Sequence, residues 1–370
     1  MFWSQLLDFF LSGLQLGAIF AFIALGYTMV YGIIKLINFA HGEFMMFGAY
    51  VGFFCLRDLG LERLGLPFPL PILISFFVAL TAASFAAGVL AVVTERLAYR
   101  PVRRAGRISA LITAVCVSLI LQNLAVKVFG AAALPYPQPR EFVAVEDLET
   151  PLPHGYAVDV PETPEGRAQA ERWNRVLGEG ATLDAAAREG LRAAGHGKVF
   201  RTIPLSDGVK RGFIILALVL WTPVLWFLVM RTRLGKAMRA VSEDNDAARL
   251  MGIPLDRIVA FTFFLGAFVA GVGGVAYCVV AGKVEPLTGF LPGLKAFVAA
   301  VIGGIGSIPG AIVGGIVLGI AERVLPFLLQ EIFAWEGAFA WKDAIAFALL
   351  IVILVFKPTG LLGKPERVKV

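Results

Sequence analysis

The chain alternates between long apolar runs and short polar segments. A helix that crosses a bilayer needs about 20 mostly apolar residues. Six runs come close to that length or exceed it, namely Phe9–Val30, Phe39–Leu56, Pro71–Val93, Ile108–Phe129, Gly212–Met230 and Ile258–Val280. Towards the C-terminus, Pro309–Leu329 is long enough, Trp341–Phe356 is marginal, and Leu294–Ile305 is too short for a full crossing. We therefore predict an all-α polytopic membrane protein with about eight transmembrane helices and one half-length or re-entrant element.

Composition and charge agree with a protein embedded in lipid. Hydrophobic residues make up 58% of the 370 positions and charged residues 16%, and the mean hydropathy is +0.79. Soluble domains carry about 25% charged residues, so a soluble globule is excluded. The net charge of +6 does not indicate nucleic-acid binding, because Lys and Arg cluster at the ends of the apolar runs and in the loops between them. That distribution sets membrane topology, and we expect the lipid bilayer, not nucleic acid, as a partner.

The basic clusters also predict an orientation, because loops rich in Lys and Arg stay in the cytoplasm. Residues Arg96–Arg107 contain five arginines and no acid, and the loop 231–257 contains six basic residues against four acidic ones. Counting back three spans from Arg96 places the N-terminus outside. The basic tail Lys357–Val370 is expected in the cytoplasm, provided that Leu294–Leu329 enters the membrane and returns as a hairpin. We expect a multi-pass protein of the cytoplasmic (inner) membrane.

A break in composition divides the chain into a first transmembrane half, residues 1–130, an insertion, residues 131–207, and a second half, residues 208–370. The insertion has twelve Asp and Glu against eight Lys and Arg, together with eight prolines. It is predicted to be a soluble, extracytoplasmic segment whose middle, Pro164–Gly190, forms two short helices joined by glycines. A cap or spacer is favoured over a specific binding role, and nothing in the segment indicates catalysis.

The polar loop 231–257 contains the signals of a short helix with both ends marked. Ser242 suits an N-cap, and acids follow in the first turn, where they favour the positive end of the helix dipole. Helix formers come next, and Gly252 with Pro254 ends the helix. The residues concerned are Ser242, Glu243, Asp244, Asp246, Ala247, Ala248, Leu250 and Gly252. Such a short helix is not stable alone in water, so we expect it to pack on the membrane domain or on a partner.

Small residues recur every four positions in the later apolar runs. The series are Gly266, Ala270 and Gly274, then Gly306, Gly310 and Gly314, and finally Gly315 with Gly319. This spacing lets helix backbones touch in lipid, where no hydrophobic force drives helices together. We predict that these glycines pack helices tightly, which by itself says nothing about cargo.

A polar motif, Asn38-Phe-Ala-His41-Gly42-Glu43, stands where the second apolar run begins. Polar groups at membrane depth are costly and usually face a partner or a cavity. Two interpretations stay open: a structural role, such as holding a broken helix together, and a role in lining the transport pathway. The structural role is favoured. The pairs Glu322–Arg323 and Lys342–Asp343 near span ends are expected to be paired or snorkelling groups rather than a proton relay.

The sequence offers no recognisable cofactor or catalytic site. Gly303–Gly310 is rich in glycine but lacks the Lys-Ser/Thr that completes a phosphate-binding loop. Gly271–Ala276 fits a loose dinucleotide fingerprint only within a helix-length apolar run, without a preceding strand. A metal site at His41 and Glu43 would need a Cys pair nearby, which is absent, and no Ser/His/Asp or Cys/His set exists. We predict that the chain is not an enzyme and holds no metal or cofactor.

Two stretches resemble a known family. Ala24–Tyr50, ALGYTMVYGIIKLINFAHGEFMMFGAY, and most of Arg233–Glu322 are similar to LivH-type permeases, one of the two membrane subunits of branched-chain amino acid ATP-binding-cassette (ABC) importers. With the spans around them, the similarity covers nearly the whole chain except 131–207. The two motifs are specific for the family but only weakly specific for the cargo, and the long insertion departs from the family pattern.

The resemblance implies an importer that also contains a second permease subunit of LivM type, two cytoplasmic ATPase subunits that bind the ATP, and an extracytoplasmic substrate-binding protein. In that arrangement the helix Ser242–Gly252 couples the permease to an ATPase. The family pattern Glu-x-x-x-Ala-x-x-x-Gly matches Glu243, Ala247 or Ala248, and Gly252. ATP-driven movement of this helix would tilt the packed spans and alternate access to a central site.

Two rival functions remain. A urea or short-chain amide ABC permease of the same superfamily would share the Asn38–Glu43 motif, and the sequence does not separate its pathway from one for leucine-like cargo. An ion-coupled secondary transporter or channel is disfavoured because it would need acids near the middle of the membrane, whereas the acids here lie close to span ends.

Overall fold

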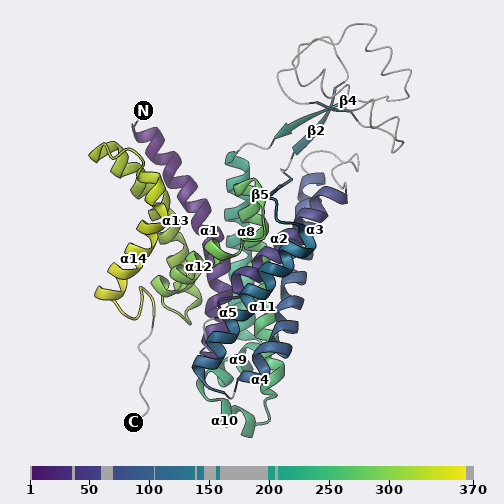
Figure 1. The fold of residues 1–370 in the computed structure, drawn as a ribbon, viewed down its shortest axis with the longest axis vertical. Coiled ribbons are helices and arrows are strands. Elements are labelled where there is room, and N and C mark those ends of the chain that lie inside the picture. Colours follow the sequence, from purple (N-terminus) through teal and green to yellow (C-terminus); the bar gives the residue numbers. More distant parts are fainter. Residues whose placement is uncertain are drawn as a thin grey trace. The chain divides into compact units, whose positions relative to one another are not determined.

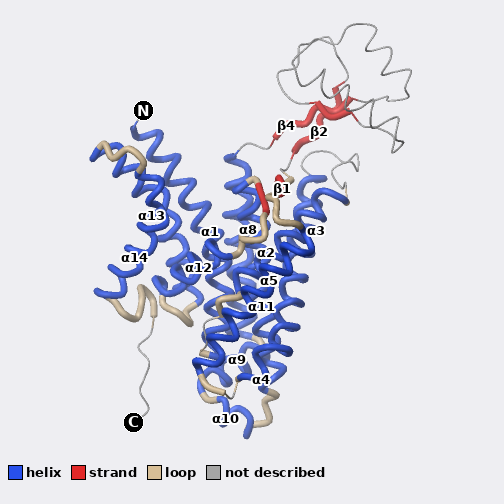
Figure 2. The backbone as a smooth tube through the Cα atoms, viewed as in Figure 1, coloured by secondary structure: helices blue, strands red, loops and turns tan. Residues whose placement is uncertain are grey.

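Apolar runs in lipid fold as helices because the backbone N–H and C=O groups find no water and must pair within the segment. The computed structural model describes residues 2–35, 38–59, 70–103, 105–137, 140–145, 156–158, 199–204 and 207–363. They divide into two units: a helical unit of residues 1–58, 77–137 and 208–370, and a second unit of residues 59–76 and 138–207. Figures 1 and 2 show the elements of each.

The described helices and helical turns are, in chain order, α1 (Phe2–Ile34), α2 (His41–Asp58), α3 (Leu70–Thr94), the π-helical turn η2 (Glu95–Tyr99), α4 (Arg100–Val102), α5 (Arg107–Phe129), α8 (Asp207–Arg231), α9 (Arg233–Glu243), α10 (Asn245–Leu250), α11 (Leu255–Ala281), α12 (Phe290–Gly303), α13 (Ile308–Phe333), the 3-10 turn η3 (Ala338–Trp341) and α14 (Lys342–Phe356). They belong to the helical unit except for residues 70–76 of α3 and Asp207 of α8. In the helical unit they are joined by two short strands. Its only described strands, β1 (Leu134–Pro135) and β5 (Lys283–Val284), form one short antiparallel pair. Residues 131–137 thus group with the helices.

Among the described residues, seven helices are long and apolar enough to cross a membrane, one fewer than the eight predicted. The difference is α2, which has 18 residues and contains Glu43, Arg57 and Asp58. The half-length element is confirmed, because α12 is an apolar helix of only 14 residues. It is followed by the turn before α13, against which it packs.

Helices α1 and α11 form the centre of the helical unit. Of their most apolar stretches, 72% and 78% of the residues are buried, against 6% for α14. Helix α1 packs against α13, α11 and α12, and α11 packs against α2 as well. The peripheral helices therefore present apolar side chains outward, as expected of a surface that meets lipid.

Glycines determine how closely these helices approach. A Cβ atom on Gly319 of α13 would overlap the backbone of Gly17 on α1, and one on Gly315 would meet Ala21. Gly266 faces the carbonyl of Gly26, and Gly274 faces that of Met45. The predicted role in packing is confirmed for Gly266 and Gly274.

The second glycine series divides into two roles. Gly310 and Gly314 of α13 touch the backbone of α12 at Gly303 and Ala299, so their predicted packing role is confirmed. For Gly306 the prediction is wrong. It lies in the turn between α12 and α13 with φ of +92° and with no other group within 4 Å of where its Cβ would stand. Gly306 stands four residues before Gly310 but is not on a helix face. It occupies a turn position that needs a left-handed backbone conformation, which glycine adopts readily.

Residues after α14 close the free end of α12. The N–H groups of Leu361 and Leu362 donate to the carbonyls of Ile302 (2.8 Å) and Gly303 (2.9 Å). The last carbonyls of a helix otherwise lack partners, so this strand-like contact satisfies them inside the protein.

The second unit contains the only other strands that the structure describes. Strand β4 (Val199–Pro204) pairs antiparallel with β2 (Arg140–Val145) on one side and with β3 (Tyr156–Val158) on the other. The register places Arg140 opposite Pro204 and Val145 opposite Val199. No strand was predicted here from the sequence, and the two helices predicted within Pro164–Gly190 lie outside the described residues.

The substitution Gly319→Ala tests the close packing of α1 on α13. Its added methyl group would overlap the α1 backbone, so we expect a loss of about 1–3 kcal/mol in stability, seen as a lower melting temperature of the purified protein and a smaller monodisperse fraction. Gly212→Ala is the matched control, because a Cβ on Gly212 meets nothing within 4 Å. Equal stability of both variants would contradict the packing.

Candidate functional site: a short exposed helix, a basic cleft and buried polar contacts

The loop 231–257 folds as two helices with a break at Asp244. Asp244 has an extended backbone (φ −156°, ψ 112°), which ends α9 and begins α10. Its Oδ1 accepts hydrogen bonds from the N–H groups of Asp246 and Ala247, both at 3.0 Å. The prediction that Ser242 caps this helix is therefore wrong. Ser242 lies in the last turn of α9, where its hydroxyl donates to the carbonyl of Arg239 at 2.7 Å.

The C-terminal end of α10 lies where the sequence predicted it, just before Gly252. Gly252 adopts φ of +78°, a left-handed conformation that ends the helix and that other residues rarely adopt. The N–H of Ile253 reaches back to the carbonyl of Ala248 at 3.0 Å. With only six residues, Asn245–Leu250, the helix is shorter than expected.

One side of α10 packs inward and the other is open. Ala248 is buried, whereas Ala247, Glu243 and Asp244 are exposed. The apolar side chains of Leu250 and Met251 are 88% and 81% exposed. Large apolar side chains so exposed on a polar segment indicate a surface that another protein covers. The family pattern left open whether Ala247 or Ala248 is its alanine, and in the structure Ala247 is exposed and Ala248 is buried.

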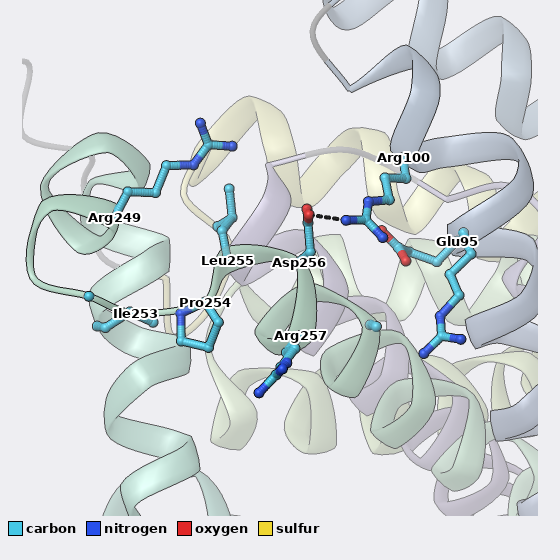
Figure 3. Close-up of a pocket in the computed structure, with 11 residues that line it drawn as sticks. Glu95, Arg100, Arg249, Ile253, Pro254, Leu255, Asp256 and Arg257 are labelled. Carbon is cyan, nitrogen blue, oxygen red and sulfur yellow. Dashed lines mark hydrogen bonds and ion pairs between the residues drawn. The ribbon is translucent and has the colours of Figure 1, made fainter.

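A cleft of about 720 Å³ lies between α10, the start of α11, and the η2–α4 turn. Figure 3 shows its lining, with the Arg100 side chain directed at Asp256. Four arginines and two acids line it: Arg96, Arg100, Arg249, Arg257, Glu95 and Asp256.

Arg103 links the two acids behind the cleft. It pairs with the buried Glu95 and, through Nη1 at 2.9 Å, with Asp256, which also pairs with Arg100. This network ties the α3–α4 region to the first turn of α11 and so fixes the position from which α10 projects. In the sequence, the arginine cluster indicates only membrane topology.

The motif Asn38–Glu43 does not converge on one point. Asn38 Oδ1 accepts hydrogen bonds from the hydroxyl of Tyr99 in η2 (2.6 Å) and from the N–H of Ala40 (3.1 Å). Glu43 Oε1 accepts from Ser118 Oγ (3.0 Å) and Gln122 Nε2 (2.8 Å), both on α5. All of these groups are buried or partly buried.

The other two motif residues contact different elements. The ring of His41 lies 4.5 Å from that of Tyr27 on α1, centroid to centroid. Gly42 lies against the backbone of Gly289 and Gly293 at the start of α12, where a Cβ would overlap the Gly289 carbonyl. The motif thus joins the start of α2 to four different elements, an arrangement expected of a structural junction.

An ionic triad with two buried side chains, Lys295 and Glu322, joins the last three helices. Lys295 Nζ of α12 lies 2.7 Å from Glu322 Oε1 on α13 and 2.6 Å from Asp343 Oδ1 on α14. The Lys295 and Glu322 side chains are 7% and 5% exposed. The pairs Glu322–Arg323 and Lys342–Asp343 were expected to be paired or snorkelling groups, and in the structure both acids pair with Lys295. Lys295 was missed, although a lone lysine in an apolar run was the available signal.

Comparison with known proteins identifies the family. The family described as "Branched-chain amino acid transport system / permease component" matches residues 9–354. The chain belongs to the branched-chain amino acid transport permease family. It is 36% identical, over 97% of its length and 96% of theirs, to the high-affinity branched-chain amino acid transport system permease proteins LivH of Escherichia coli (strain K12) and BraD of Pseudomonas aeruginosa.

More distant relatives share only part of the chain. The autoinducer 2 import system permease protein LsrC of Yersinia enterocolitica is 31% identical over 39% of this permease and 39% of its own length. No solved structure matches. The family membership confirms the resemblance seen in the two sequence motifs.

The ionic triad gives a prediction for this permease. Lys295→Met leaves the Glu322 carboxylate buried without its counter-ion, and we expect a loss of about 3–5 kcal/mol in stability, measured as a lower melting temperature. The double variant Lys295→Met/Glu322→Met removes both buried charges and should recover most of that loss. A single variant as stable as the unchanged permease would show that the pair does not form.

Proposed function

We propose that this permease is a membrane subunit of an ABC importer for branched-chain amino acids and that α10 is its contact with a separate ATPase subunit. The exposed pair Leu250 and Met251 carries the proposal, because a helix of six residues with apolar side chains in solvent needs a partner. The chain has no recognisable ATP-binding motif of its own, so the energy must come through such a contact.

The ion-pair network behind α10 supports transmission of force. Arg103 and Arg100 join α10's neighbour, α11, to the α3–α4 region. Helix α11 in turn packs against α1 and α2 along its buried length. A push on α10 would therefore reach the central helices as a rigid displacement rather than being absorbed in a loop.

The remaining partners and the orientation belong to the same proposal. The importer would contain a second permease subunit of LivM type, two ATPase subunits and an extracytoplasmic binding protein. The ends of the helical unit that carry α10 and the start of α1 are opposite one another (Figure 1). With α10 in the cytoplasm, the N-terminus is outside, which agrees with the lack of basic residues before Lys35.

The cargo is proposed from the relatives. The two that match over nearly the full length, LivH and BraD, are named for branched-chain amino acid transport, whereas LsrC, named for autoinducer 2 import, matches over less than half of the chain. Urea or a short-chain amide is the alternative cargo, and the permease itself would catalyse no chemical reaction.

The substitution Leu250→Glu tests the contact with the ATPase. The side chain is exposed, so the fold should persist, but a charge in an apolar contact should lower ATP-driven uptake and ATPase retention roughly tenfold or more. Leu287→Glu is the matched control, an exposed leucine in the segment before α12. If both variants transport normally at normal abundance, α10 is not the coupling element.

Uptake into proteoliposomes that contain the permease, its partner permease, the ATPases and the binding protein tests the cargo. We expect ATP-dependent uptake of labelled leucine that unlabelled valine and isoleucine compete away and that urea and acetamide leave unchanged. Competition by urea or acetamide would show that the cargo is urea or a short-chain amide. Uptake without ATP would overturn the ABC assignment and favour a secondary transporter.

A further inference from the structure

Three arginines in the cleft beside α10 have no acidic partner among the described residues. Asp256 and Glu95 are already paired with Arg100 and Arg103. Arg96, Arg249 and Arg257 line the same cleft and form no ion pair within the described ranges. The acids at the junction of α9 and α10, Glu243, Asp244 and Asp246, do not line it. The cleft therefore has an excess of positive charge that nothing in the described chain neutralises.

The cleft lies where two membrane spans end. Arg96 and Arg100 are in the last turns of the span Leu73–Val102, and Arg257 is in the first turn of the span Leu255–Ala281. Ala260, further inside the second span, also lines the cleft. Residues at the ends of spans stand at the level of the lipid headgroups.

An exposed apolar stripe on α3 leads to this cleft. Its members follow at intervals of four residues, on one side of the helix: Phe85, Val89, Val93 and, in η2, Leu97, with exposed fractions of 58%, 42%, 45% and 76%. Twelve helical residues extend about 18 Å, slightly more than one leaflet of a hydrocarbon core about 30 Å thick. The stripe thus has the length of an acyl chain, and Arg96 and Arg100 stand at its end.

We propose that the cleft binds the phosphate headgroup of an anionic phospholipid whose acyl chain lies along the α3 stripe. Arg96 and Arg257 line the cleft from the two spans, and Arg249 lines it from α10. Basic pockets between transmembrane helices bind anionic headgroups. The bound lipid would neutralise the arginines beside α10 and hold that helix at a fixed height above the membrane. The proposal concerns a lipid site and does not depend on the cargo.

The charge of the lipid is the testable property. The importer complex is assembled in nanodiscs of phosphatidylcholine with about 10% phosphatidylglycerol and then extracted into detergent, and the phospholipid that stays bound is counted by mass spectrometry. We expect phosphatidylglycerol to be enriched over its share of the nanodisc. In the variant Arg96→Gln/Arg257→Gln this enrichment should fall roughly fivefold for each arginine removed.

Arg233→Gln is the matched control, since Arg233 is an exposed arginine near the end of α8 that does not line the cleft. It should keep the enrichment. Size-exclusion profiles and melting temperatures of all variants show whether they are folded. Unchanged enrichment in the folded double variant overturns the proposal. Loss of ATPase binding together with unchanged lipid enrichment also overturns it, and assigns the arginines to an acidic surface of the ATPase.

Discussion

Direct contact between the backbones of α1 and α13 is the constraint on which the rest of the helical unit depends. Helices in lipid gain nothing from hiding apolar side chains from their surroundings, so association needs close van der Waals contact. Gly17 and Gly319 supply it at one crossing, and Gly26 with Gly266 does so between α1 and α11. Helix α1 also packs against α12, α9 and α2, so its contacts with α13 and α11 help to position these elements.

Polar contacts then fix the elements that glycine packing alone would leave free. The half-length helix α12 is anchored at three places. Its first turn contacts Gly42, and Lys295 near its middle pairs with carboxylates of α13 and α14. Its last carbonyls accept hydrogen bonds from the segment after α14. A helix too short to span needs such anchors because lipid offers its free ends no hydrogen bonds. The start of α2 is anchored by polar contacts as well, because Asn38, His41 and Glu43 each contact a different neighbouring element.

Much of the fold could be predicted from the length and spacing of residue patterns in the sequence. The rest depends on contacts between residues that are far apart in the sequence. Apolar length predicted the spans and the short α12, and the spacing of Gly310 and Gly314 predicted a contact. The same spacing failed at Gly306, because period alone does not separate a helix face from a turn. Ser242 and Asp244 are both good caps, and only the backbone shows which one the chain uses. Lys295 and its two acids are far apart in sequence, so their pairing was not predictable, and the strands β2–β4 follow no clear alternation.

The proposed contact of α10 is with an ATPase subunit on the cytoplasmic face. A photo-crosslinking amino acid at position 250 in the assembled importer tests this contact, with position 97, on the exposed apolar stripe of α3 and η2, as the comparison. We expect an adduct of position 250 with the ATPase and adducts of position 97 with lipid. An adduct of position 250 with the extracytoplasmic binding protein, or with lipid alone, would contradict both the contact and the orientation.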